Sequence, residues 1–182
     1  MKRYENAVSP VVGVMLMLVV TIIIAAVVSA FAGGAVSGQK KIPQATITGK
    51  FSVSNGLQIT HTGGDGLATA DMVFIVRDGP LFGPNLELKT AQVLNKTNIT
   101  NGNGLPLDKG DGTTDVTAFI SGDTLYISGE NATCSLLQPL VYASGKLDLC
   151  ISNTTSIGKT FSLELSDSRG NLISKNDVVI TA

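Results

Sequence analysis

The sequence contains few of the residues from which catalytic sites are usually built. It has no tryptophan, one histidine and two cysteines in 182 residues, and 15% of its residues are charged. The histidine, His61, belongs to no recognisable catalytic motif, and the chain contains no Gly-x-Ser-x-Gly. We therefore expect a structural or exposed histidine, no catalytic site and no cofactor.

Sites for phosphate, metal and nucleic acid are also not predicted. The glycine-rich loop Gly63–Gly66 has neither a P-loop lysine nor a following helix. The carboxylates of Asp108, Asp111 and Asp115 do not have the spacing of an EF-hand, so we expect a solvated acidic loop. The chain has no basic patch of the kind that binds nucleic acid.

Charge is absent from one long apolar tract, residues 11–32. Only Gly13, Thr21 and Ser29 interrupt its aliphatic and aromatic residues. As a helix, this tract is about 33 Å long, enough to cross a hydrocarbon core of about 30 Å. A helix that is apolar all round is buried on every side. Its surroundings must therefore be lipid or the same helix from neighbouring copies.

Three interpretations of this tract compete. In the first it is a cleaved secretory signal, with Lys2 and Arg3 as the positive start and a small-residue cleavage site within 28–32. The tract is longer than the ~7–15 apolar residues of such a signal. In the second it is a plain membrane anchor. In the third it is a retained helix preceded by a short, removable leader, residues 1–6.

The residues at the start of the tract favour the third interpretation. Residues 7–14 read Ala-Val-Ser-Pro-Val-Val-Gly-Val, directly after a charged leader and directly before the apolar helix. This arrangement closely resembles the N-terminus of archaeal type IV pilins. The stretch Ile59–Asp65 also looks like one that recurs in the heads of these pilins.

The resemblance implies that a prepilin peptidase cuts between Asn6 and Ala7 and leaves the helix on the mature protein. Ser9 is a good N-cap, and Pro10 suits the first helical position. The residues expected at the core of a helical polymer are Val8, Pro10, Val11, Gly13, Val14, Leu16, Leu18, Ile22 and Ala26. Small residues that would allow close approach of helices are Gly13, Ala25, Ala26, Ser29 and Ala30.

The charges near the tract predict its orientation. Lys2 and Arg3 favour a cytoplasmic N-terminus, which places the rest of the chain outside the cell. Loss of the leader would reduce the 13 basic and 14 acidic residues to 11 and 13, a net charge of −2.

We expect four parts: a leader (1–6), an apolar assembly helix (7–36), a neck (37–44) and a head (45–182). Short runs rich in β-formers separated by turns predict an all-β head, an immunoglobulin-like β-sandwich, and hence an α+β fold class. The expected strands are 45–53, 57–61, 72–76 (buried), 123–128, 146–151, 160–166 and 172–181. The expected turns and loops are Asn55-Gly56, 62–66, 79–80, 83–84, 98–112 and 168–171.

The two cysteines, Cys134 and Cys150, lie in the expected head. In an oxidising exterior a disulfide between them is favoured over two buried thiols. Without a Cys-x-x-Cys motif or nearby histidines they do not predict a zinc site.

Four Asn-X-Thr sequons are candidate N-glycosylation sites if the head is outside the cell. They are at Asn95, Asn98, Asn131 and Asn153. Chance alone yields one or two in a chain rich in asparagine and threonine, and we expect at least two to be used.

The sequence thus predicts the structural subunit of an adhesive, type IV pilus-like filament on the cell surface. The resemblance implies a membrane-inserted precursor and three partners: the prepilin peptidase, an assembly ATPase and a membrane platform protein. An archaellum-type subunit, a minor or tip pilin, a membrane-anchored binding module and an anchored enzyme are the alternatives. Binding modules predict detergent-soluble monomers that keep the leader.

Overall fold

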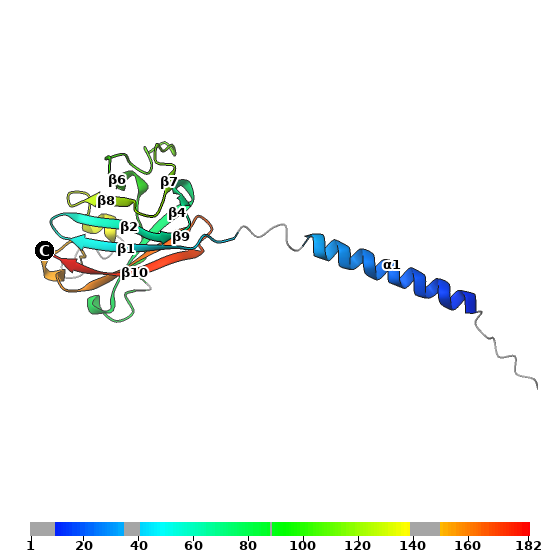
Figure 1. Ribbon diagram of the computed structural model, residues 1–182. Coiled ribbons are helices and arrows are strands. Elements are labelled where there is room, and N and C mark those ends of the chain that lie inside the picture. Colours follow the sequence, from blue (N-terminus) through cyan, green and yellow to red (C-terminus); the bar gives the residue numbers. More distant parts are fainter. Residues whose placement is uncertain (1–9, 35–40, 88, 139–149) are drawn as a thin grey trace, which may run out of the picture. The chain divides into compact units, whose positions relative to one another are not determined.

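The computed structural model describes residues 10–34, 41–87, 89–138 and 150–182. The chain divides into two compact units, residues 1–41 and 42–182. The first contains the helix α1, and the second is the head (Figure 1).

Helix α1 runs from Pro10 to Gly34. Its β-branched residues have low helix propensity in water, but an apolar environment requires every backbone group to bond within the segment. The hydroxyl of its one threonine also bonds within the helix: Thr21 donates to the carbonyl of Leu18 at 2.9 Å. The predicted helix is confirmed over these 25 residues, and its predicted end at Val36 lies outside the described residues.

The regular elements of the described head are mainly β-strands, as expected. Its strands are β1 (Ala45–Ser52), β2 (Gly56–Gly64), β3 (Leu67–Ala68), β4 (Met72–Asp78), β5 (Gln92–Val93), β6 (Thr100–Asn101), β7 (Ala118–Phe119), β8 (Thr124–Ser128), β9 (Thr160–Asp167) and β10 (Leu172–Thr181). A four-residue helix, α2 (Cys134–Leu137), follows β8. Short 3-10 turns lie at Thr69–Asp71, Pro80–Phe82, Lys96–Asn98 and Thr154–Ser156.

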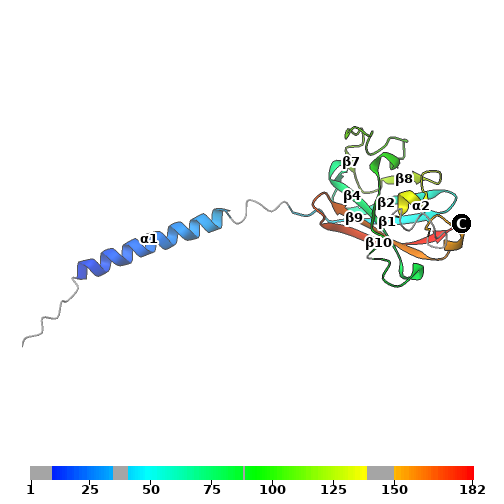
Figure 2. The same cartoon turned by 180° about the vertical axis from the view of Figure 1, so that it is seen from behind.

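Within the described residues the strands form one eight-stranded sheet, in the order β5-β4-β9-β10-β1-β2-β8-β6, and a small β3-β7 sheet. The large sheet consists of two antiparallel halves joined where β1 and β10 run parallel, side by side in both views (Figures 1 and 2). The α+β layout is therefore confirmed, with one continuous sheet in place of the two separate sheets of a β-sandwich. The immunoglobulin-like arrangement stays a prediction.

The joint between the halves lies between β1 and β10. Backbone pairing of β1 with β10 is confined to Phe51–Ile180 and Ser52–Thr181. Earlier in β1, side chains bridge the strands, because the backbone N–H of Gly49 donates to Asn176 Oδ1 at 2.9 Å. A Cβ on Gly49 would lie 2.5 Å from Val178 Cγ2, so any larger residue would require Val178 or the strands to shift. Backbone pairs at the end of β1 and a side-chain bridge before it therefore join the two halves into one sheet.

The inner faces of both halves share one hydrophobic core. Phe51 of β1 packs edge-on against Phe161 of β9, with ring centroids 5.6 Å apart. The largest fully buried side chains are Phe74, Phe119, Phe161, Ile47, Leu57, Ile59, Met72, Ile99, Leu125, Ile127, Leu137 and Ile151. The head therefore buries a core made only of its own residues.

Most predicted strands are confirmed, and so are two turns. Asn55-Gly56 joins β1 to β2, with Gly56 at φ +87°, and 168–171 joins β9 to β10. Two expectations were wrong, and a third is tested only at its last two residues. Strand β2 continues through the predicted 62–66 loop to Gly64, because it pairs with β1 as far as Ala45. Strand β4 alternates between buried and half-buried residues, since only one of its faces meets the core. Of the predicted 146–151 strand, 146–149 lie outside the described residues, and Cys150 and Ile151 lie in no strand.

Candidate functional site: the exposed apolar helix

Helix α1 presents its whole apolar surface to its surroundings. Every described side chain from Val11 to Ala32 is exposed. The exposed fraction of the large apolar side chains ranges from 44% at Val20 to 74% at Met17. Residues 11–32 are long and apolar enough to cross a membrane. No packing within the described chain explains this composition.

Removing the apolar side chains of α1 from water would be strongly favourable. Burying a single Val, Leu, Ile or Met side chain stabilises by about 1.5–3 kcal/mol. The helix has such residues on all its faces, so water is an unfavourable environment for each face. One neighbouring surface would cover one face only. The helix therefore requires a medium or a set of partners that surrounds it.

Gly13 of α1 is also unexplained by contacts within the described chain. A Cβ on Gly13 would meet nothing within 4 Å. In a membrane or a helix bundle, such a residue lets another backbone approach closely. The predicted assembly residues Val11, Gly13, Val14, Leu16, Leu18, Ile22 and Ala26 are all exposed on α1, and Pro10 is its first residue. Asn6, Ala7 and Val8 lie outside the described residues.

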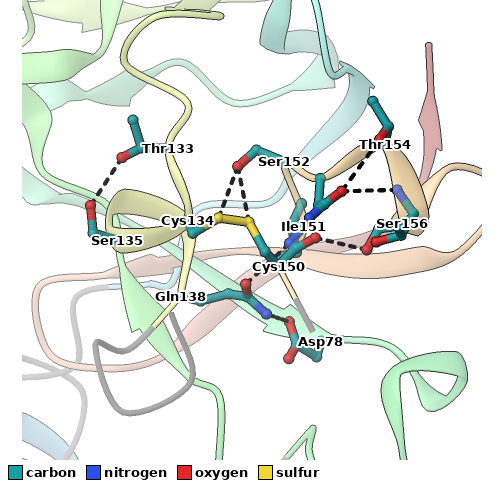
Figure 3. The surroundings of a disulfide bond; sticks show 12 residues. Asp78, Thr133, Cys134, Ser135, Gln138, Cys150, Ile151, Ser152, Thr154 and Ser156 are labelled. Atoms are coloured by element: carbon teal, nitrogen blue, oxygen red, sulfur yellow. Dashed lines mark hydrogen bonds between the residues drawn. A yellow bond between two sulfur atoms is a disulfide. The ribbon is translucent and has the colours of Figure 1, made fainter. Parts of the chain in front are cut away.

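The head contains the predicted disulfide. Cys134, at the start of α2, is bonded to Cys150, with their Cα atoms 5.3 Å apart (Figure 3). The Ser152 hydroxyl lies 3.4 Å from the sulfur of Cys134 and 3.2 Å from that of Cys150. The bond closes a loop with a sequence separation of 16, which is worth about 3 kcal/mol in the chain-entropy model.

A buried polar bridge lies beside the disulfide and was missed at the sequence level. Gln138 donates from Nε2 to Asp78 Oδ1 at 2.6 Å and accepts at Oε1 from the N–H of Ile151 at 3.1 Å (Figure 3). It thereby ties both ends of the disulfide loop to the end of β4. Burial raises the pKa of Asp78 to about 6, although the Gln138 hydrogen bond and the charge of Lys159 work in the opposite direction.

The four sequons lie on the head surface to different degrees. Asn95 and Asn131 are exposed, and Asn98 and Asn153 are half-buried. The side chain of Asn95 accepts from the N–H of Thr97 at 3.0 Å. Asn153 accepts in the same way from its own sequon threonine, two residues on, at 3.1 Å. Their use as glycan acceptors stays a prediction.

The other candidate residues are held by local contacts. Asp108 Oδ1 accepts from the N–H groups of Gly110 and Gly112 at 2.7 and 3.1 Å, and Asp115 pairs with Lys109 at 2.8 Å. Across the described ranges, no three His, Cys, Asp or Glu residues are grouped so that they could hold a metal ion. His61 is fully buried in β2, where its Nε2 lies 3.1 Å from the carbonyl of Asp65.

Comparison with known families bears on the helix. Residues 6–47 match the model of the family described as archaeal type IV pilin, N-terminal. No curated protein matches the chain. The match covers all of α1 and the first residues of β1. It supports a filament subunit of the pilin or archaellin type.

Proposed function

We propose, on the premise that its N-terminal segment is that of an archaeal type IV pilin, that the chain is the structural subunit of an adhesive cell-surface filament. The observation that carries this proposal is a helix with the pilin N-terminal sequence and no buried face. Such a helix is stable in a membrane before assembly and among copies of itself afterwards. The role is structural, and no catalytic step is assigned to the head.

Assembly begins with the precursor in the cytoplasmic membrane. A prepilin peptidase removes residues 1–6 by cutting between Asn6 and Ala7. A membrane platform protein and an assembly ATPase then transfer the mature subunit from lipid to the base of the filament.

The transfer from lipid to filament keeps the apolar surface out of water. Lipid tails are as apolar as leucine, so helix association gains little from the hydrophobic effect and depends on close packing. Gly13, Ala26 and the other small residues supply the close approach, and Val11, Val14, Leu16, Leu18 and Ile22 supply the contact area. The helices form the filament core, and the heads (45–182) coat it.

The heads form the outer, extracellular surface and carry adhesion. The exposed sequons Asn95 and Asn131 are the first candidates for N-glycans there. Glycans would cover polar groups and protect the surface of the filament. An archaellum-type subunit is the second candidate, because the same family match supports it.

Mass spectrometry of the subunit from sheared surface filaments tests the proposal. We expect a mature chain that begins at Ala7, with glycopeptides that contain Asn95 or Asn131. Cells without the gene should lose filaments and surface attachment and keep swimming. A subunit that begins at Met1 or near Gly33 would refute the filament proposal, whereas loss of swimming alone would identify an archaellum subunit.

A further inference from the structure

We infer that a pocket beside β6 and β8 of the head binds the terminal unit of a neutral oligosaccharide. This inference rests on the adhesive function proposed above and names the class of ligand. The pocket has a volume of about 410 Å³, within the usual range of about 300–1,000 Å³ for small-ligand sites. Its lining includes Asn101, Asn103, Phe119, Asp123, Thr124 and Tyr126, from β6, β7, β8 and their loops.

One wall is a turn fixed by Asn101. Its Oδ1 accepts from the N–H groups of Asn103 and Leu105 at 3.0 and 2.9 Å, and its backbone N–H donates to the carbonyl of Leu105 at 2.9 Å. These bonds use the oxygen of the Asn101 amide. Within the described part of the chain, its Nδ2 and the side-chain amide of Asn103 make no hydrogen bond, so both remain available to a ligand.

A second fixed turn, residues 120–123, contributes Gly122 and Asp123 to the lining. Asp123 Oδ2 accepts from the N–H of Ile120 at 3.0 Å, and the backbone N–H of Asp123 donates to the carbonyl of Ile120 at 3.0 Å. Backbone hydrogen bonds attach the turn to β2. The backbone N–H of His61 donates to the carbonyl of Asp123 at 2.9 Å, and the backbone carbonyl of His61 accepts from the N–H of Gly122 at 2.8 Å. Asp123 Oδ1 has no hydrogen bond to any described residue.

Aromatic residues complete the pocket. Phe119 is 1% exposed and is held edge-on by the His61 ring, with centroids 5.1 Å apart. Tyr126 is 37% exposed, and its hydroxyl makes no hydrogen bond among the residues that the structure describes. The pocket therefore combines an accessible aromatic ring with two turns that are already fixed in place.

These groups fit a ligand with many hydroxyls and an apolar ring face. The amides of Asn101 and Asn103 donate, the carboxylate of Asp123 accepts, and the Tyr126 hydroxyl does both. A sugar presents hydroxyl donors and acceptors around its rim and C–H groups on its faces, which pack on an aromatic ring. Because the lining contains one carboxylate and no cation, an acidic sugar would be repelled. Preformed turns reduce the ordering cost of binding.

A glycan array carrying neutral, sialylated and sulfated oligosaccharides tests the inference, with the full chain in detergent as the probe. We expect binding to neutral members only. For the best of these, Tyr126→Ala should weaken affinity at least about tenfold, and Asn103→Ala about fivefold. Tyr126→Phe, which keeps the ring, should weaken it about threefold or less. Ser128→Ala, on the same strand and exposed like Tyr126, is the matched control and should change nothing.

Circular dichroism of each variant verifies that the head is folded. Absence of binding to any neutral glycan, binding confined to sulfated or sialylated glycans, or equal binding by Tyr126→Ala would each overturn the inference. The assay does not require filaments. Sugar binding by a chain that never polymerises would refute the filament proposal and support the sugar-binding pocket. Filaments that bind no sugar would support the filament proposal and refute the sugar-binding pocket.

Discussion

At the scale of single residues, Asp78 is unusual because it is a fully buried carboxyl with one hydrogen-bonded oxygen. Oδ1 accepts from Gln138, whereas Oδ2 has no partner within the described residues. Burial favours the neutral acid, and the pKa rises from 3.8 to about 6. The folded state therefore binds this proton more tightly than the unfolded chain. The stabilisation that results from this tighter proton binding is fully present below pH 4 and is lost as the pH rises through 6.

Asp78→Asn should stabilise the head at neutral pH. The amide keeps an acceptor for Gln138 and cannot ionise, so it avoids a cost of about 3 kcal/mol for a shift of about two pKa units. We expect thermal unfolding, followed by circular dichroism, to occur at a higher temperature for the variant at pH 7–8. The gain should shrink towards zero at pH 4.

The difference between variant and wild type at each pH isolates Asp78 from the other acids. Asp167, for example, has its pKa lowered to about 2, mainly by the Asn171 side chain, so its stabilising effect is lost only as the pH falls below 4. A gain that is equal at pH 4 and pH 8, or no gain at all, would show that Asp78 is not destabilised by ionisation.

Sequence reasoning identified residues whose role is local or chemically unique. The Asn55-Gly56 turn depends on a positive φ at Gly56. The sequence has only two cysteines, so each has one possible disulfide partner within the chain. It missed the Asp78–Gln138 bond because these residues are 60 positions apart and neither has a pattern that indicates burial. The pocket was missed for a similar reason: its walls come from separate loops that only the folded sheet brings together.

At the scale of elements, α1 was predictable because its composition alone requires a surrounding apolar medium. The strands were mostly predictable from turns and β-formers. Their pairing was not, since the parallel joint of β1 and β10 links residues about 130 positions apart. Neither that joint nor the close approach at Gly49 has a local signal.

Ile22→Lys should prevent filament assembly, because a lysine near the middle of an apolar helix costs about 2.5–3.5 kcal/mol in a membrane and more in a bundle that cannot rearrange. Leu172→Lys is the matched control. In the isolated chain Ile22 and Leu172 are similarly exposed, at 59% and 54%, but only Ile22 is expected to become buried.

Electron microscopy of cells and immunoblots of membrane fractions measure the outcome. We expect both variants in the membrane and filaments only with Leu172→Lys. Normal filaments with Ile22→Lys would mean that this position faces neither lipid nor another helix.

At the scale of the whole molecule, the two units have different requirements. The head buries a hydrophobic core made of its own residues. The described side chains of α1 are exposed in the isolated chain, so the helix needs lipid or neighbouring helices around it. Water is a favourable environment for the surface of the head but not for α1, whereas lipid is favourable for α1. The proposed filament, with helices inside and heads outside, would meet both requirements.

The burial of α1 in lipid-free filaments is most directly measured by cysteine labelling. Leu16→Cys, Met17→Cys, Leu18→Cys and Val19→Cys place a thiol on four faces about 100° apart. The native cysteines are in a disulfide and do not compete. In washed, detergent-free filaments we expect all four thiols to resist a charged maleimide and to react after denaturation. Rapid labelling at any of the four positions in intact filaments would contradict a helix that is enclosed by copies of itself.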